Sequence, residues 1–211
     1  MKYRLSEKYL LSLLDILTIK LSSKVTLNSL AKETDLKSHT VVARYLEYLE
    51  AAYAVHMIYQ FDLNKKRALM RKEKKIYFAD PFIFHASRTY IWAYRNPFKA
   101  TIDWLSQDEN RSKLVENIVA INFVRKLPPE PWRRIHLITY YAENSEGDFI
   151  TRLDGEFVTI EVKWREKEIK PSKTQLKISS HLKSKNIIVT RDKFKITERV
   201  TYVPAPLIAL L

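Results

Sequence analysis

The chain of 211 residues contains no cysteine and only two glycines, Gly147 and Gly155. The absence of cysteine excludes disulfides and thiolate metal sites. Two isolated glycines cannot build a Walker A loop or a dinucleotide fingerprint, so nucleotide binding by those routes is excluded. No apolar run is long enough to span a bilayer, and the charged start MKYRLSEKYL does not have the pattern of a signal peptide. We therefore expect a cytoplasmic protein that holds no nucleotide and does not enter a membrane.

Positive charge, in contrast, is abundant. The formal net charge is +13 at pH 7 and the isoelectric point is about 9.7. A chain this basic favours an acidic partner, nucleic acid first, and we expect the partner to be DNA. Hydrophobic residues make up 46% of the sequence, which is enough for a substantial core in one large or two small domains.

The stretch from Asp148 to Lys163, DFITRLDGEFVTIEVK, has the pattern of a β-hairpin. Its Asp154-Gly155 dipeptide favours a type I′ turn, because both central residues of that turn need a positive φ. Folding the chain back at this turn places Asp148 opposite Glu161, with their Cβ atoms roughly 5 Å apart. Like charges in this position repel each other, so we expect either a bound cation or Lys163 between them.

Two carboxylates with a lysine two residues further on are typical of metal-dependent phosphodiester cleavage. Asp148 and Glu161 offer the hard oxygen ligands that Mg²⁺ or Mn²⁺ prefers, and a bound metal can activate a water. Lys163 would then orient that water or offset charge on the phosphate. The alternative is a surface carboxylate pair that Lys163 neutralises. The spacing alone leaves both interpretations open.

The N-terminal part predicts a helix-turn-helix with a basic hairpin. Apolar spacing indicates helices at 6–20, 26–34 and 39–52, followed by strands at 53–61 and 75–79 with a basic loop between them. Such an order is typical of a winged helix, which binds either DNA or a protein partner. The candidate DNA contacts are Lys37, His39, Thr40 and Arg44 on the third helix and Lys65, Lys66, Arg67, Arg71 and Lys72 on the hairpin.

Residues 80–110 are rich in aromatic side chains and predict two short helices. We expect the segment from Phe82 to Trp104 to be mostly buried between an N-terminal and a C-terminal domain. The alternative is that its aromatic side chains, interleaved with Arg88 and Arg95, stack on nucleic-acid bases.

The second half predicts an α/β sandwich with a mixed sheet, a helix on each side, and the acidic site at one edge. Glu116 lies on the first of these helices. It is either a surface residue near Lys113 or a third carboxylate that points at the hairpin. The predicted elements are helix 111–127, strand 135–142, the two strands of the hairpin, helix 171–184 and strand 186–191, with a further candidate strand at 199–203.

The order of these residues resembles a known fold. Glu116 on a helix, Asp148 on a strand and Glu-Val-Lys at 161–163 resemble the PD-(D/E)XK restriction-endonuclease-like fold. The strings KKIYFADPFIFHA and KLVENIVAINFV resemble the C-terminal region of archaeal and bacterial AAA-type ATPases, in which a winged helix precedes such a domain. The resemblance covers most of the chain, from about residue 24 to about residue 190, but not the ATPase domain, so we expect either a stand-alone relative or a C-terminal fragment.

The resemblance implies a role for each site residue. Asp148, Glu161 and the carbonyl of Val162 would hold Mg²⁺ or Mn²⁺, and Glu116 would complete the metal shell directly or through water. Lys163 would be the catalytic lysine. The resemblance also suggests an accessory role for Gln175 on the following helix.

The fold class expected overall is α+β. It comprises a winged helix-turn-helix at 1–80, an aromatic-rich helical connector at 81–110 and a PD-(D/E)XK nuclease-like domain at 111–211. The expected function is that of a DNA-binding, Mg²⁺-dependent nuclease, and the alternative is a non-catalytic regulator that binds DNA or a protein partner and retains a relic site. A homo-oligomer or an ATPase partner would fit either function. Three carboxylates converging on one point would favour the nuclease, and a centre plugged by Lys163, Arg152 or an aromatic ring would favour the regulator.

Overall fold

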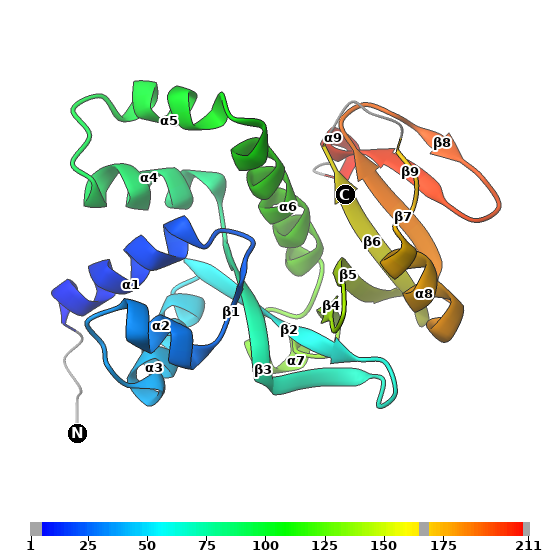
Figure 1. Cartoon of the computed structure of the whole chain (residues 1–211), viewed down its shortest axis with the longest axis horizontal. Helices are drawn as coiled ribbons and strands as arrows, with labels where there is room; N and C mark the ends of the chain where they lie inside the picture. The colour runs from blue at the N-terminus through cyan, green and yellow to red at the C-terminus, as the bar shows by residue number, and fades with distance from the viewer. Residues whose placement is uncertain (1–5, 165–168, 209–211) are drawn as a thin grey trace.

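The structure, a computed structural model, describes residues 6–164 and 169–208. It is an α+β protein in which helices pack around one large mixed sheet, as the sequence predicts at this level (Figure 1). No helix in the described ranges has the length and apolar character needed to cross a membrane. The elements are α1 (Glu7–Ile19), β1 (Lys24–Val25), α2 (Leu27–Glu33), α3 (His39–Ala51), β2 (Val55–Asp62), β3 (Arg67–Phe78), α4 (Pro81–Ile91), α5 (Pro97–Leu105), α6 (Asp108–Arg125), α7 (Pro131–Arg134), β4 (Ile138–Ala142), β5 (Glu146–Leu153), β6 (Glu156–Lys163), α8 (Lys173–Leu182), β7 (Lys185–Thr190), β8 (Lys195–Ile196), β9 (Thr201–Pro204) and α9 (Ala205–Ile208).

A single nine-stranded sheet runs through both halves of the described chain. Its order is β1-β3-β2-β4-β5-β6-β7-β9-β8. The two halves meet where β2 and β4 pair in parallel, with Tyr59 opposite Thr139 and Gln60 opposite Tyr140. The side-chain amide of Gln60 also donates to the carbonyl of Ala142 on β4. The hairpin of the N-terminal region is therefore built into the same sheet as the strands that follow residue 110.

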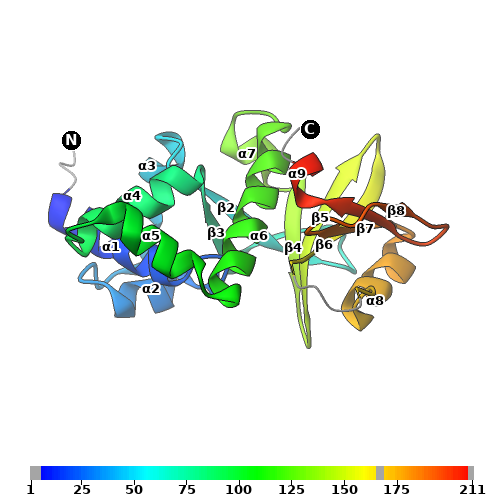
Figure 2. The same ribbon diagram turned by 90° about the horizontal axis from the view of Figure 1, so that it is seen from above.

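The N-terminal helices form where the sequence predicts them, within one or two residues at each end. Thr26 and Ser29 form a reciprocal capping box that starts α2, with Ser29 N donating to Thr26 Oγ1 at 2.9 Å. Leu13, Leu30 and Leu46, one from each helix, are fully buried in a common core. These helices gather at one end of the molecule, and α8 lies near the other end (Figure 2).

The second hairpin differs from its prediction. The sequence predicts a basic loop up to residue 74, but β3 begins at Arg67 and continues for 12 residues. The register jumps from Tyr59 opposite Lys74 to Gln60 opposite Leu69, so the four residues from Met70 to Glu73 form a bulge. The run of charged residues conceals this strand, because several of its side chains face solvent on the bulge.

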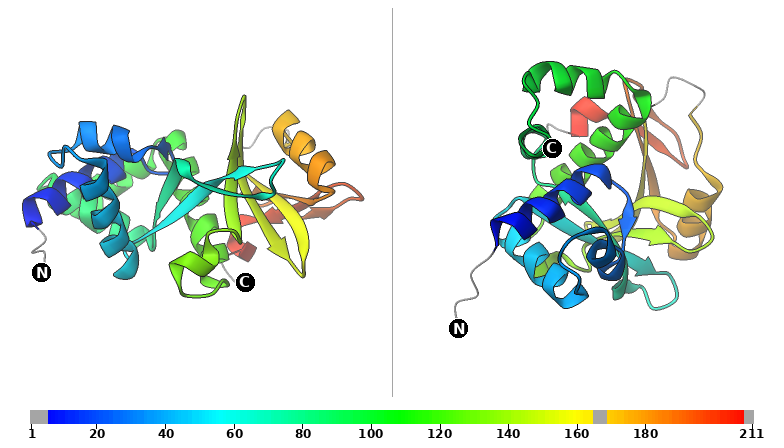
Figure 3. Two further views of the ribbon diagram at one scale, coloured as in Figure 1. Left: turned by 90° about the horizontal axis from the view of Figure 1, so that it is seen from below. Right: turned by 60° about the vertical axis from the view of Figure 1, so that its left-hand side comes forward.

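The aromatic connector is exposed, and the expectation of burial was wrong. Phe84 is fully buried and Trp104 is half-buried against the N-terminal core. Helices α4 and α5 each bury only a narrow face, and α5 lies at the periphery (Figure 3). The exposed fractions of the other five rings are 77% for Phe82, 69% for Tyr90, 56% for Trp92, 41% for Tyr94 and 76% for Phe98.

Helices α6 and α8 cover opposite faces of the sheet, as predicted. Phe149 and Ile160 pack with α6 residues in one core, while Ile150 packs with Ile178 and Leu182 of α8 in another. The site does not lie at an edge of the sheet, which corrects the prediction. Strands β5 and β6 pair with each other in the interior of the sheet. The strands β4, β2, β3 and β1 extend the sheet on one side of this pair, and β7, β9 and β8 extend it on the other.

Candidate functional site

The hairpin β5–β6 has the register that the sequence predicts. Phe149 lies opposite Ile160, so Asp148 and Glu161 occupy the next positions outward. Asp154 and Gly155 in the turn have φ values of 51° and 83°, which are the positive values that a type I′ turn needs. Local turn chemistry therefore fixes which carboxylates meet.

Asp148 is partly buried beside β6. Its Oδ2 accepts the backbone N–H of Val162 at 2.7 Å. The N–H and C=O of a strand residue project to the same neighbouring strand, so the carbonyl of Val162 also faces the Asp148 side. Burial, followed by the charge of Glu116, raises the pKa of Asp148 to about 7, although Lys75 and the Val162 N–H act in the opposite direction. Glu161 adds a smaller contribution that also raises this pKa.

Glu161 is held by two groups of the protein. Its Oε2 accepts the backbone N–H of Ser172, the residue that caps α8, at 3.0 Å. Its Oε1 lies 3.3 Å from Nζ of Lys163. The two side chains therefore share a face of β6, as their spacing predicts, and Lys163 partly neutralises Glu161.

Glu116 points into the sheet and does not lie beside Lys113. Its Oε1 accepts a hydrogen bond from the hydroxyl of Tyr77 at 2.7 Å and lies 2.9 Å from Nζ of Lys75. Lys113 instead pairs with Glu109, one turn earlier on α6. Of the two interpretations of Glu116, the inward-pointing carboxylate is the one that the structure shows.

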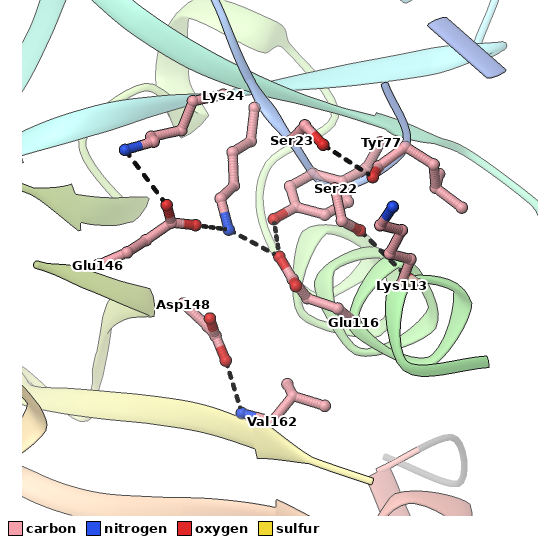
Figure 4. Close-up of polar contacts among 11 residues, drawn as sticks. Ser22, Ser23, Lys24, Tyr77, Lys113, Glu116, Glu146, Asp148 and Val162 are labelled. Atoms are coloured by element: carbon pink, nitrogen blue, oxygen red, sulfur yellow. Dashed lines mark hydrogen bonds and ion pairs between the residues drawn. The ribbon is translucent and has the colours of Figure 1, made fainter. Parts of the chain in front are cut away.

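Lys75 of β3 is the residue that sequence reasoning missed. Its side chain is only 1% exposed, and its Nζ bridges Glu116 and Glu146, at 2.6 Å from Oε1 of Glu146. Oε2 of Glu146 lies 3.4 Å from Nζ of Lys24 on β1. Burial alone would lower the pKa of Lys75, but Glu116, Asp148 and Glu146 together raise it above its usual value. Figure 4 shows Glu146, Asp148 and Glu116 near one another. We call these three acids, together with Glu161 and Lys75, the acidic centre.

The sequence carries a weak signal for these missed residues. Side chains on a strand alternate between its faces, so Glu146 must share a face with Asp148, and Lys75 with Tyr77. This period of two identifies companions on one strand. It does not reveal that β3, far away in the sequence, contributes to the centre that β5 builds.

The carboxylates of α6 and of the hairpin β5–β6 approach one another, and ammonium groups lie among them. Both Glu116 and Glu161 influence the pKa of Asp148, so the three acids are neighbours. In residues 6–164 and 169–208, however, no three His, Asp or Glu side chains are arranged to hold one ion. The ammonium of Lys75 binds Glu116 and Glu146 directly. The acids and ammonium groups therefore form a charge-compensated network.

Gln175 and Arg152 lie outside this network. Gln175 is 2% exposed, and its Nε2 donates to the carbonyl of Ile187 at 3.0 Å and of Thr159 at 3.4 Å. It therefore ties α8 to β6 and β7 and does not reach the acids. The guanidinium of Arg152 stacks on the ring of Phe157, with 4.1 Å between Cζ and the ring centroid.

The candidate DNA contacts are accessible with one exception. Lys37, His39 and Thr40 are exposed at the start of α3, and Arg44 is half-buried. Residues 67–72 of the hairpin and His136 line a concave surface that encloses a volume of about 570 Å³. The hairpin cations are exposed, and none of them forms an ion pair with another described residue: Lys65, Lys66, Arg67, Arg71 and Lys72.

Comparison with known proteins gives one match. Residues 4–90 are similar to a family described as a domain of unknown function, DUF8612. The match covers the N-terminal helices, the hairpin β2–β3 and nearly all of α4, and it ends before Glu116. It therefore includes Lys75 but not the carboxylates that Lys75 contacts. No curated protein and no solved structure matches the chain.

Proposed function

We propose that the protein binds duplex DNA through the hairpin β2–β3 and the start of α3, and that its acidic centre is a non-catalytic, charge-compensated relic of a nuclease site. The observation that carries the second part is the position of Lys75. Its ammonium binds two carboxylates of the centre from a buried position.

The DNA part rests on the distribution of charge. Backbone phosphates dominate the affinity of proteins for DNA, and exposed Lys and Arg side chains are their usual contacts. Arg67, Arg71 and Lys72 line the concave surface beside the hairpin β2–β3. Lys65 and Lys66 lie in the turn that joins β2 to β3. The order of α1 to α3 followed by β2 and β3 supports a winged helix, in which the first residues of α3 would enter the major groove.

The proposal that the acidic centre is non-catalytic rests on the cost of buried charge. A carboxylate that is desolvated without a partner is costly, and Lys75 supplies that partner to the largely buried Glu116. Glu161 receives Ser172 N–H and Lys163 in the same way. Groups of the protein thus bind both oxygens of Glu161 and one oxygen each of Glu116 and Asp148, which supports the plugged arrangement expected of a regulator, although the plug is Lys75.

The DNA proposal is tested by removing Lys65, Lys66 and Arg67 together as alanine variants. Affinity for duplex DNA should fall, and so should the slope of log affinity against log salt, by up to about 0.9 for each phosphate that the variant no longer neutralises. A matched control replaces three exposed lysines elsewhere, Lys126, Lys183 and Lys195, which gives the same change in net charge. Equal reductions in both triple variants would show that only overall charge matters, and the hairpin would be removed from the proposal.

Metal-dependent phosphodiester hydrolysis is a second candidate, favoured by Asp148. Burial, followed by the charge of Glu116, raises the pKa of this carboxyl to about 7, and a divalent cation would stabilise its charged form. Asp148, Glu161, Glu116 and the carbonyl of Val162 offer hard oxygen ligands, although Oε1 of Glu116 already binds Lys75. The bound ion would supply an activated water.

Calorimetric titration with Mn²⁺ separates the two candidates. A nuclease should bind the ion and cleave duplex, branched or single-stranded DNA, and Asp148→Ala or Glu161→Ala should abolish ion binding. Lys163→Ala should leave binding of metal and DNA intact but stop cleavage, because it removes a transition-state interaction. Absence of ion binding to the wild type at millimolar concentration, with and without DNA, would eliminate the nuclease candidate.

A further inference from the structure

The α4–α5 connector contains a concave site that neither the hairpin nor the acidic centre involves. Its volume is about 400 Å³, within the usual range for small-molecule sites. Tyr94 and Trp104 contribute aromatic rings to it, and Asn96, Lys99 and Gln107 contribute polar or charged groups. Helix α5 and the loop before it therefore hold aromatic and hydrogen-bonding groups around one hollow.

A buried arginine organises this site. Arg88 is 9% exposed, and its Cζ lies 5.4 Å from the ring centroid of Tyr94 and 5.6 Å from that of Trp104. One terminal nitrogen donates to the carbonyl of Ala100 at 2.8 Å. Its Nε is buried and has no hydrogen-bond partner among the described residues, and Arg88 itself contributes to the lining of the hollow. The guanidinium of Arg88 therefore adds a positive charge to the wall of the hollow, which favours a ligand that carries negative charge.

The surroundings select the class of ligand. Arg88 and Lys99 line the site together with Asp103, and beside it Arg95 follows Tyr94 while Asp15 accepts a hydrogen bond from Trp92. Exposed rings flank the same loop, with Trp92 on one side and Phe98 on the other. Flat apolar faces combined with cations match unpaired nucleotides, in which bases stack on aromatic rings and phosphates pair with Lys or Arg.

We propose that this site binds an unpaired nucleotide of single-stranded DNA, with a base stacked at Tyr94 and the phosphate near Lys99. The proposal extends the nucleic-acid binding proposed above to a second surface and a different form of DNA. A paired base cannot reach the site, because its faces are covered by its neighbours in the duplex. The protein would thus contact a duplex at the hairpin and an unpaired strand at the connector.

Fluorescence anisotropy with labelled oligo-thymidine tests the proposal on the full chain. Tyr94→Ala should weaken binding of the oligonucleotide by about tenfold, as expected when one base stack is removed. Lys99→Glu should also weaken it, and this exposed residue can be changed without disturbing the core. Phe82→Ala is the matched control, because it removes an exposed ring that does not line the site, and it should bind like the wild type.

Three further measurements make the outcome decisive. Thymidine 5′-monophosphate should compete only weakly, because the proposed ligand is part of a strand, and strong competition would overturn the assignment to single-stranded DNA. Wild-type affinity for oligo-thymidine in both Tyr94→Ala and Lys99→Glu would overturn the proposal. A change in sedimentation without a change in DNA binding would assign the surface to contact between copies of the chain, and would also overturn it. The hairpin triple variant should lose duplex binding independently, so failure of one proposal does not decide the other.

Discussion

The two hairpins of the sheet, β5–β6 and β2–β3, carry opposite charge and are specified in different ways. In β5–β6 the Asp154-Gly155 turn sets the register and brings two carboxylates together. In β2–β3 the positive φ falls on Lys66, which is not glycine, and a bulge interrupts the ladder. The register of the first hairpin can be predicted from its sequence, whereas the register of the second depends on its neighbours in the folded protein.

The comparison also separates two kinds of lysine on one strand. Lys72 of β3 is exposed on the bulge, and Lys75, three residues later, is buried among the acids of the other hairpin. One hairpin thus supplies the cation that compensates the carboxylates of the other. Substitutions in the two hairpins should reveal this dependence, and the largest effect is expected at the buried lysine.

Lys75→Met should remove that compensation. Breaking a buried ion pair by deleting one partner costs about 3–5 kcal/mol, because the largely buried Glu116 would lose its cation, whereas the exposed Glu146 would keep Lys24. The free energy of unfolding in urea measures the change. Lys72→Met on the same strand is the control and should change it by less than about 0.5 kcal/mol. Similar values for the two variants would contradict the buried-network description.

Asp148→Asn should stabilise the protein in a pH-dependent manner. The pKa of this carboxyl rises from its usual 3.8 to about 7 on folding, so its favourable contribution is complete below pH 4 and is lost as the pH rises through 7. The variant should therefore be more stable than the wild type by about 2–4 kcal/mol at pH 8 and lose that advantage near pH 4. Urea unfolding at several pH values tests this, and a difference independent of pH would refute it.

Gly155→Ala should weaken the β5–β6 hairpin by about 1 kcal/mol. A Cβ at this position would meet nothing within 4 Å, so the cost comes from the positive φ of 83° alone. Thermal and urea unfolding would report it. An unchanged stability would mean that the turn tolerates an L-residue and does not enforce the register.

Lys66→Gly should have the opposite sign in the other hairpin. Its φ of 49° is unfavourable for lysine, so glycine should stabilise the turn by about 0.5 kcal/mol after the extra entropy of the unfolded chain is included. The same unfolding assay measures this gain. A decrease in stability would indicate that the Lys66 side chain makes a stabilising contact in the folded state.

Elements with local signals could be predicted from the sequence. The helices followed from apolar spacing, and the register of β5–β6 followed from its turn. The pairing of Glu161 with Lys163 followed from alternation along β6. These features depend on residues close together in the chain.

Features that depend on distant partners could not be predicted. Lys75 on β3 and Glu146 on β5 lie far apart in the chain, and composition does not indicate which lysine becomes buried. The exposure of Tyr90 and Phe98 was misjudged for a related reason. Aromatic residues at helical spacing predict a core only if another element covers them, and α4 and α5 have one covered face each.

The pairing of β2 with β4 has a consequence for how the chain can be divided. Separating residues 1–80 from the remainder would leave β2 and β4 each with a row of unpaired backbone groups. Such bare strand edges act as templates for other chains, so isolated fragments should self-associate. For the same reason, we expect the intact chain to melt in one cooperative transition and not in two. Because the two halves share one sheet, neither half could be transferred to another protein without exposing a strand edge.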